Sequence, residues 1–257
     1  MFGYEIVFVH GAWAGPWVWR TWSPFFASNG WPVRSITLPG HGPGDSEAGL
    51  GLKEFASYME RVVTEPEKTV LIGHSMGGWV CLKFMEAHRV AASVLVAPMP
   101  VNGLPARTRN AMMAMAPFGT IKTVLFGISS KLDDDKIVRK TCFLPDTPEP
   151  VVASFRQRTV ALSAKAARQM ALFPIFGPGI SRRKIRRLQE GVPHLVLASE
   201  KDFYFRPKEL EKTVELLGTS VQLCEGYPHC MMEVDDSRKL AARVDSWLKE
   251  HLTSSLT

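Results

Sequence analysis

The fold of this chain is decided by the stretch Thr69-Val70-Leu71-Ile72-Gly73-His74-Ser75-Met76-Gly77-Gly78-Trp79-Val80-Cys81-Leu82. A β-branched, apolar run ends at Gly73, and an apolar segment of helical length begins after Met76, so the stretch predicts a strand, a tight turn and a helix. In the pattern G-x-S-x-G at such a turn, the serine has strained backbone angles that push its hydroxyl beyond the end of the strand. Ser75 is therefore the candidate nucleophile.

Length and composition indicate one ordinary globular unit. The 257 residues can bury one large core, and 46% of them are hydrophobic and 22% charged. No apolar run reaches about eighteen residues, so we expect no segment that spans a membrane. The first residues lead into a strand without a basic region or a small-residue cleavage site, so we expect a cytoplasmic protein. The sequence does not indicate an oligomeric state.

The cysteines do not form a metal or disulfide pattern. Cys81, Cys142, Cys224 and Cys230 lie far apart without C-x-x-C spacing. This spacing favours reduced, mostly buried thiols over a disulfide framework or a zinc site. We expect no metal and no cofactor.

Strands and helices alternate on both sides of a long middle segment. The apolar and turn patterns predict strands at residues 4–9, 31–38, 69–73, 93–97, 194–198 and 220–224. Amphipathic or buried helices separate them, for example at residues 52–63 and 207–217, and a closing helix follows at 235–251. This alternation predicts right-handed βαβ units and a mostly parallel, six-stranded sheet flanked by helices.

The alternation breaks between residues 99 and 191. This segment has helical stretches at 107–116, 150–162 and 181–189, and it has no convincing strand. We predict that it is a helical lid, or cap, inserted before the last two strands of a core made of residues 1–98 and 192–257. Because ligands bind at the carboxyl ends of parallel strands, an insertion from that edge is expected to cover the site.

Two further residues stand where a serine nucleophile needs its partners. A serine hydroxyl needs a base that takes its proton, and the base needs an orienting acid. In an α/β sheet the order is serine, acid, histidine, each just past a strand. His229 follows the last predicted strand, and Asp202 follows the one before it. Glu200 is the alternative acid, but Asp202 lies farther out in the turn.

A developing oxyanion needs two backbone donors. The N–H of Met76 at the start of the predicted helix is one of them. Gly11 lets the loop after the first strand turn so that the N–H of Ala12 can face the same point. His10 is expected to brace this loop.

The chain resembles the α/β-hydrolase superfamily over the whole of its body. The motifs that carry the resemblance are His10-Gly11-Ala12-Trp13, Pro39-Gly40-His41-Gly42, Gly73-His74-Ser75-Met76-Gly77-Gly78, Asp202 and His229. The N-terminal motif is most similar to the branch that holds methylesterases and hydroxynitrile lyases. The lyases have a threonine at the position of Gly11 and a lysine at the position of Cys230, so the resemblance implies an esterase rather than a lyase.

These observations predict a cofactor-free serine hydrolase that cleaves small to medium carboxylic esters through an acyl-enzyme. Lactones, thioesters and activated C–C bonds could pass through the same residues, which makes a lactonase, a thioesterase or a C–C bond hydrolase the alternative. An alternative of another class is a ligand-binding receptor with the same fold and little turnover.

The lid holds the candidates for substrate contact and most of the positive charge. Met112 and Met115, together with Trp13 beside the oxyanion loop, are candidate substrate-binding residues. Residues 99–191 have sixteen Lys and Arg against six Asp and Glu, and five of the basic residues lie at 182–187. This basic helix is either a solvated face or a surface that attracts an anionic substrate or a membrane. No nucleic-acid motif accompanies the charge, so we expect no nucleic-acid partner.

Overall fold

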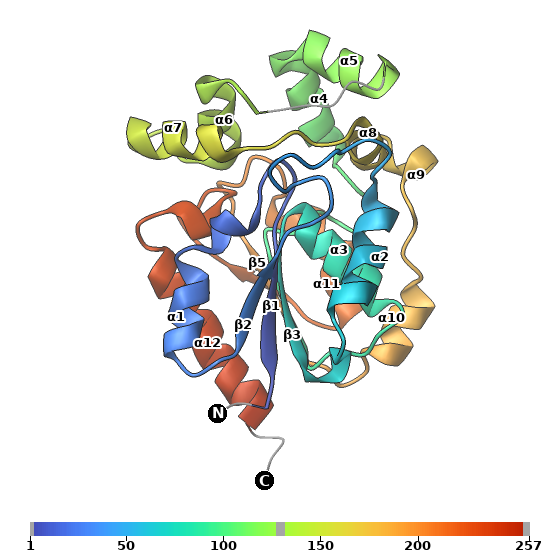
Figure 1. Cartoon of the computed structure of the whole chain (residues 1–257), viewed down its shortest axis with the longest axis vertical. Coiled ribbons are helices and arrows are strands. Elements are labelled where there is room, and N and C mark those ends of the chain that lie inside the picture. The colour runs from blue at the N-terminus through green and yellow to red at the C-terminus, as the bar shows by residue number, and fades with distance from the viewer. Residues whose placement is uncertain (1–2, 127–131, 254–257) are drawn as a thin grey trace.

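The centre of the molecule is a six-stranded sheet, seen in a computed structural model that describes residues 3–126 and 132–253 (Figure 1). The strand order is β2-β1-β3-β4-β5-β6, and every neighbouring pair is parallel. The strands are β1 Glu5–Val9, β2 Val33–Ile36, β3 Thr69–His74, β4 Ala92–Val96, β5 His194–Ala198 and β6 Val221–Leu223. The predicted α/β architecture with a parallel sheet is confirmed.

Helices cover both faces of the sheet. One face carries α1 and α12, which contact each other, and the other carries α2, α3, α10 and α11 (Figure 1). The α-helices of this core are α1 Trp22–Ser28, α2 Leu52–Val62, α3 Met76–Met85, α10 Arg182–Leu188, α11 Glu211–Leu217 and α12 Ser237–Thr253. Short 3-10 helices are η1 Pro16–Trp19, η2 Pro66–Lys68, η3 Pro207–Leu210 and η4 Met231–Glu233.

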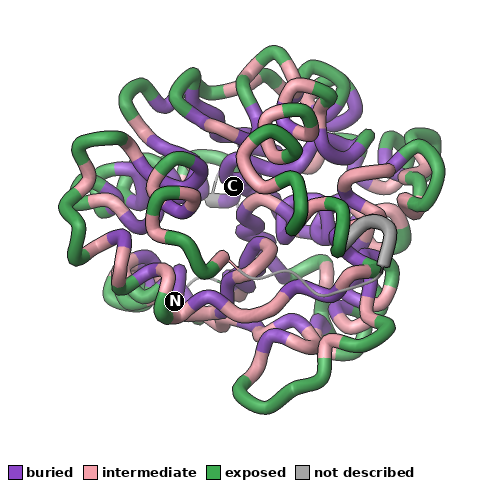
Figure 2. Tube along the Cα trace, turned by 90° about the horizontal axis from the view of Figure 1, so that it is seen from above, coloured by how far each residue is buried: buried purple, intermediate pink, exposed green. Residues whose placement is uncertain are grey.

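The core consists of two apolar layers, one on each side of the sheet. Every residue of β3, β4 and β5 is buried, as expected for strands that helices cover on both faces. Trp79 of α3 belongs to one layer, and Trp19 and Trp22 belong to the other, where Trp19 packs 4.9 Å from the ring of Phe8. Figure 2 shows the buried residues mainly in the interior of the molecule and the exposed ones mainly at its periphery. The β-branched runs of the sequence therefore end up in the middle of the molecule.

A sharp turn joins β3 to α3 at Ser75. Its backbone angles, φ 54° and ψ −122°, are ones that side-chain-bearing residues rarely adopt. A Cβ atom added at Gly77 would lie 2.4 Å from the carbonyl oxygens of Val9 and His10, so only glycine lets the first turn of α3 approach the end of β1 so closely. The turn thus brings Ser75 beside the loop that follows β1.

Between β4 and β5, the described residues form seven helices. They begin with α4 Ala106–Met115, α5 Pro117–Phe126, α6 Asp135–Cys142, α7 Glu149–Arg158, α8 Ala164–Ala171 and α9 Phe173–Phe176. These six lie above the carboxyl ends of the strands, whereas the seventh, α10, packs on α3 and α11 beside the sheet (Figure 1). We refer to α4–α9 below as the upper helices. The sequence pattern indicated α4, α7 and α10 and missed the other four.

Over the described ranges, none of the helices is both long and apolar enough to cross a membrane.

Candidate active site

A buried acid–base pair lies at the carboxyl edge of the sheet. His229 Nδ1 is 2.8 Å from Asp202 Oδ2, and the two residues are only 4% and 1% exposed. The other carboxylate oxygen, Oδ1, accepts the backbone N–H groups of Tyr204 and Phe205 at 2.6 and 2.9 Å. A carboxylate oxygen can only accept a hydrogen bond, so Oδ2 accepts the Nδ1–H of His229. This tautomer leaves Nε2 of His229 free to accept a proton. Glu200, the alternative acid, is exposed and lines a surface groove instead.

Opposing effects set the pKa of His229. Burial lowers it, because a charged imidazole is poorly solvated there, but the charge of Asp202 and its hydrogen bond raise it. The attraction outweighs the burial, so the pKa of His229 lies above its usual value of 6.5.

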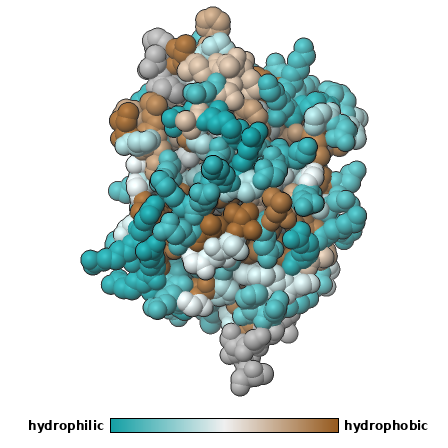
Figure 3. All heavy atoms as spheres, turned by 180° about the vertical axis from the view of Figure 1, so that it is seen from behind, coloured by the Kyte–Doolittle hydropathy of each residue, from teal (hydrophilic) through white to brown (hydrophobic). Residues whose placement is uncertain are grey.

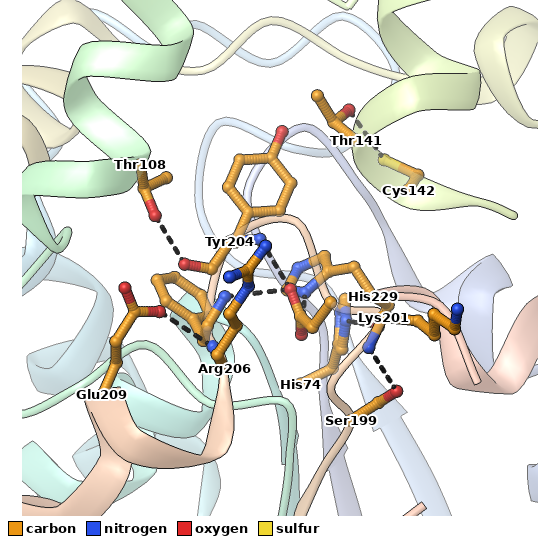
Figure 4. A network of polar contacts seen from close by, with 12 residues as sticks. His74, Thr108, Thr141, Cys142, Ser199, Lys201, Tyr204, Arg206, Glu209 and His229 are labelled. Carbon is orange, nitrogen blue, oxygen red and sulfur yellow. Dashed lines mark hydrogen bonds and ion pairs between the residues drawn. The ribbon is translucent and has the colours of Figure 1, made fainter. Parts of the chain in front are cut away.

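The turn that carries the acid is held by α4. The Thr108 hydroxyl, fully buried, donates to the carbonyl oxygen of Tyr204 at 2.6 Å (Figure 4). Arg107 donates to the same oxygen at 3.1 Å and forms a two-point ion pair with Glu209, with both contacts at 3.0 Å. An upper helix therefore fixes the backbone that positions Asp202.

Ser75 and His229 line the same cavity. His74, the residue before the serine, is 4% exposed, and its Nε2–H donates to the carbonyl oxygen of His229 at 3.1 Å. The two imidazole rings lie 4.8 Å apart, centre to centre. Burial, together with the nearby His229, keeps the pKa of His74 well below 6.5, so His74 is a neutral link between the serine turn and the loop of His229.

The loop after β1 is held by His10, which is fully buried. Its Nδ1–H donates to the carbonyl oxygen of Gly11 at 2.9 Å, and its Nε2 accepts the N–H of Leu38 at 3.0 Å. Burial, reinforced by the neighbouring His41, lowers the pKa of His10 to about 3, so this neutral tautomer is fixed. In a trans peptide the N–H points opposite to the C=O, so the Ala12 N–H faces away from the His10 ring.

The cavity is small and mainly apolar. Its volume is about 30 Å³, enough for about two water molecules. Predicted site residues at its wall are Ala12, Trp13, Ser75, Met76, Met112 and His229, while Asp202 lies behind His229. Met115 is not in the wall, since it is the last residue of α4, about 4.5 Å farther along the helix than Met112.

The sequence profile of the Alpha/beta hydrolase family matches residues 6–243. The chain belongs to this family.

Among the relatives of this alpha/beta hydrolase is Methylesterase 3 of Arabidopsis thaliana, which is 28% identical over 103 residues. That match spans 37% of this chain and 39% of the relative, so the chain matches well under two thirds of its length. The relationship agrees with the esterase-like resemblance that the sequence motifs carry.

Solved structures of similar shape cover almost the whole chain. MenH from S. aureus has a TM-score of 0.72 at 21% identity, over 98% of this chain and 95% of that one. An esterase from Exiguobacterium antarcticum has a TM-score of 0.71 at 19% identity, over 96% and 92%. Polyneuridine aldehyde esterase has a TM-score of 0.63 at 18% identity, over 94% and 99%. At these identities the likeness shows the fold, and the predicted α/β-hydrolase fold is confirmed.

Several wall residues of this alpha/beta hydrolase were missed from the sequence. They are Ala14, Val18, His74, Met99, Leu104, Leu132, Cys142, Phe155, Met170, Tyr204, Phe205 and Cys230. Tyr204 and Phe205 follow Asp202 within three residues, and Cys230 directly follows His229, so proximity to the predicted triad was a usable signal for these three. His74 directly precedes Ser75, so the serine motif was a signal for it as well. The others come from separate loops and helices, and no local pattern marks them. Within residues 3–126 and 132–253, no cluster of three His, Cys, Asp or Glu side chains is arranged to hold a metal ion.

The basic helix of this hydrolase lies away from the cavity. Ile185 of α10 is fully buried, and Arg186 pairs with the exposed Glu215 of α11 at 3.2 Å. Figure 3, which views the molecule from behind, shows hydrophilic side chains spread over much of the surface. Since α10 packs beside the sheet and does not line the cavity, its position favours a solvated face over attraction of an anionic substrate.

Proposed function

We propose that this protein is a serine hydrolase that cleaves small carboxylic esters through an acyl-enzyme. The observation that carries the proposal is the buried His229–Asp202 pair beside an apolar cavity that Ser75 also lines. A serine, a histidine and an acid in this relation are the groups that acyl transfer needs.

In the proposed reaction, the Ser75 hydroxyl attacks the ester carbonyl while Nε2 of His229 takes its proton. Asp202 keeps the other ring nitrogen protonated and stabilises the imidazolium that forms. The backbone N–H groups of Ala12 and Met76 are proposed to bind the oxyanion. His229 then protonates the departing alcohol, and a water molecule, activated by the same base, releases the acid and restores Ser75.

The size and lining of the cavity support a small, apolar acyl group. A volume of about 30 Å³ does not hold an ester, so we propose that the upper helices and the side chains of the wall shift when a substrate binds. We therefore propose that the segment 99–191 supplies the lid through α4–α9, with Trp13 and Met112 contacting the substrate. The sulfur-containing and aliphatic side chains of the wall, such as Met99, Met112 and Met170, can adapt to different apolar groups.

The space around Gly11 supports the esterase over the lyase. A Cβ atom added at Gly11 would lie 3.0 Å from both Ser75 Cβ and His74 Nδ1. A side chain of the size of threonine does not fit there unless the serine turn moves.

The proposal is tested with p-nitrophenyl esters of graded acyl length, assayed beside lactones, thioesters and C–C bond substrates. We expect steady turnover that is highest for short acyl chains. If kcat/KM is higher for a lactone, a thioester or a compound with an activated C–C bond, that class rather than the ester is the substrate. A single burst equal to the enzyme concentration, with no further turnover, would instead favour a receptor.

The proposed role of His229 has a pH signature. Because the base must be neutral, kcat/KM should fall tenfold per pH unit on the acid side, below a pKa that lies above 6.5. The sign follows from Asp202, which stabilises the protonated imidazole and so raises its pKa. The measurement is kcat/KM for an uncharged ester between about pH 5 and 9.

The matched control for the pH profile is Asp202→Asn. Without the carboxylate charge, the main effect that opposes burial of His229 is lost, so the acid limb of the residual activity should move to lower pH. A limb that stays in place in this variant, or one below pH 6.5 in the wild type, would contradict the role assigned to the pair.

The cytoplasmic location stays a prediction.

A further inference from the structure

Two cysteines meet at the wall of the cavity. Cys142 is the last residue of α6, and Cys230 directly follows His229; each is 3% exposed, and both line the cavity. The backbone N–H of Cys230 donates to the carbonyl oxygen of Cys142 at 3.0 Å. Standard bond lengths then keep the two Cα atoms within about 7 Å, which is the range that a disulfide can bridge.

The two neighbouring thiols also differ in acidity. The Cys230 side chain, together with the charge of His229, lowers the pKa of Cys142 despite burial. Burial, reinforced by Cys142 and nearby carboxylates, raises the pKa of Cys230 well above its usual value. The Thr141 hydroxyl lies 3.5 Å from the Cys142 sulfur, a contact that Figure 4 shows next to Tyr204. Cys142 is thus the sulfur prepared to attack, with a protonated thiol beside it.

We propose that Cys142 and Cys230 form an oxidation site, which hydrogen peroxide entering the cavity converts into a disulfide. Cys142 first releases its proton to become a thiolate, which attacks one peroxide oxygen. The O–O bond breaks, and the departing hydroxide combines with the proton that Cys142 released to give water. Cys142 is then a sulfenic acid. The Cys230 thiol attacks this sulfur, the S–O bond breaks, and the hydroxyl leaves with the thiol proton as a second water. The two sulfurs supply the two electrons that reduce the peroxide.

The disulfide would join an upper helix to the loop of the catalytic base. α6 lies above the sheet (Figure 1), and Cys230 directly follows His229 in the chain. A disulfide between Cys142 and Cys230 would therefore fix α6 over the cavity. This consequence for activity rests on the proposed function, since it assumes that α4–α9 must move to admit an ester. Formation of the bond itself does not depend on it.

The test of the bond is chemical and needs no substrate. The folded protein is treated with hydrogen peroxide, its remaining thiols are blocked in denaturant, and the cross-links are mapped by peptide mass spectrometry. Trypsin places Cys142 in residues 141–156 but leaves Cys224 and Cys230 together in residues 213–238, so the mapping is done in Cys224→Ser. We expect the free thiols of the wild type to fall from four to two, with residues 141–156 linked to 213–238.

Matched variants separate this pair from the other thiols. Cys81 and Cys224 are also buried but lie outside the cavity wall, so Cys81→Ser and Cys224→Ser should retain the link, while Cys142→Ala and Cys230→Ala should lose it. Four free thiols after peroxide treatment, or a link that survives either alanine change, would overturn the proposal. The wild-type thiol count stands even if an alanine variant fails to fold.

The activity arm compares each protein with itself before and after oxidation. We expect peroxide to lower wild-type kcat/KM by on the order of tenfold, because access to the cavity is restricted, and dithiothreitol to restore it. Cys142→Ala should keep its own starting activity after the same treatment. Equal inactivation of that variant would assign the loss to another residue, and a disulfide without any change in activity would overturn the locking of α6.

Discussion

Replacing Ser75 with alanine should lower kcat for ester hydrolysis by roughly 10⁶-fold, the loss seen when a serine nucleophile is removed from such a triad. The change deletes one oxygen and leaves the rest of the turn in place. Alanine carries the same Cβ at φ 54°, so the strained backbone is no worse than before. The measurement is kcat for a short-chain p-nitrophenyl ester, with labelling by a fluorophosphonate as a second readout.

The matched control is Ser181→Ala, which removes a serine that caps α10 far from the cavity. It should retain both turnover and labelling. Thermal unfolding of Ser75→Ala should match that of the wild type. Covalent labelling of Ser75→Ala at the wild-type rate would show that another residue is the nucleophile.

The second large effect is expected from Asp202→Asn, which should lower kcat by on the order of 10⁴-fold. Asparagine keeps an oxygen that can accept the N–H groups of Tyr204 and Phe205, so the turn is preserved. Its amide nitrogen, however, donates toward Nδ1 of His229 and favours the tautomer that carries the proton on Nε2. Once it is protonated, Nε2 of His229 can no longer accept the proton of Ser75. The measurement is kcat in parallel with circular dichroism of the folded state.

Glu200→Gln is the control for the acid. It makes the same carboxylate-to-amide change two residues away, on an exposed side chain in a surface groove. Its kcat should stay close to that of the wild type. If this variant shows the large loss and Asp202→Asn does not, the assignment of the acid is wrong.

The sequence identified the features that depend on local backbone rules. Gly77 was marked by its motif, and its hydrogen atom indeed faces two carbonyl oxygens at a distance no side chain tolerates. The parallel sheet followed from the alternation of strands and helices, because only a limited set of connections packs helices on both faces. Asp202 could be favoured over Glu200 from its place in the turn alone, and it is Asp202 that lies against His229.

The wall of the cavity depended on packing that the sequence does not record. Met112 and Met115 are equivalent in a helical pattern, and only the position of α4 over the sheet places one at the wall and leaves the other outside it. Cys142 and Cys230 lie 88 positions apart in the sequence and match no spacing rule, so their proximity could not be predicted. The basic helix α10 had a charge pattern but no indication of which helices it would pack on.

The hydrogen bonds from Arg107 and Thr108 to Tyr204 have a consequence for protein engineering. The Tyr204 carbonyl, two residues after Asp202, accepts these hydrogen bonds from α4, which lies in the segment that we propose as the lid. A chimaera that replaces residues 99–191 with a foreign segment would leave the Tyr204 carbonyl without these donors and the Glu209 carboxylate without its partner. An exchange of the proposed lid should therefore retain the first turn of α4 and place the junction after Thr108.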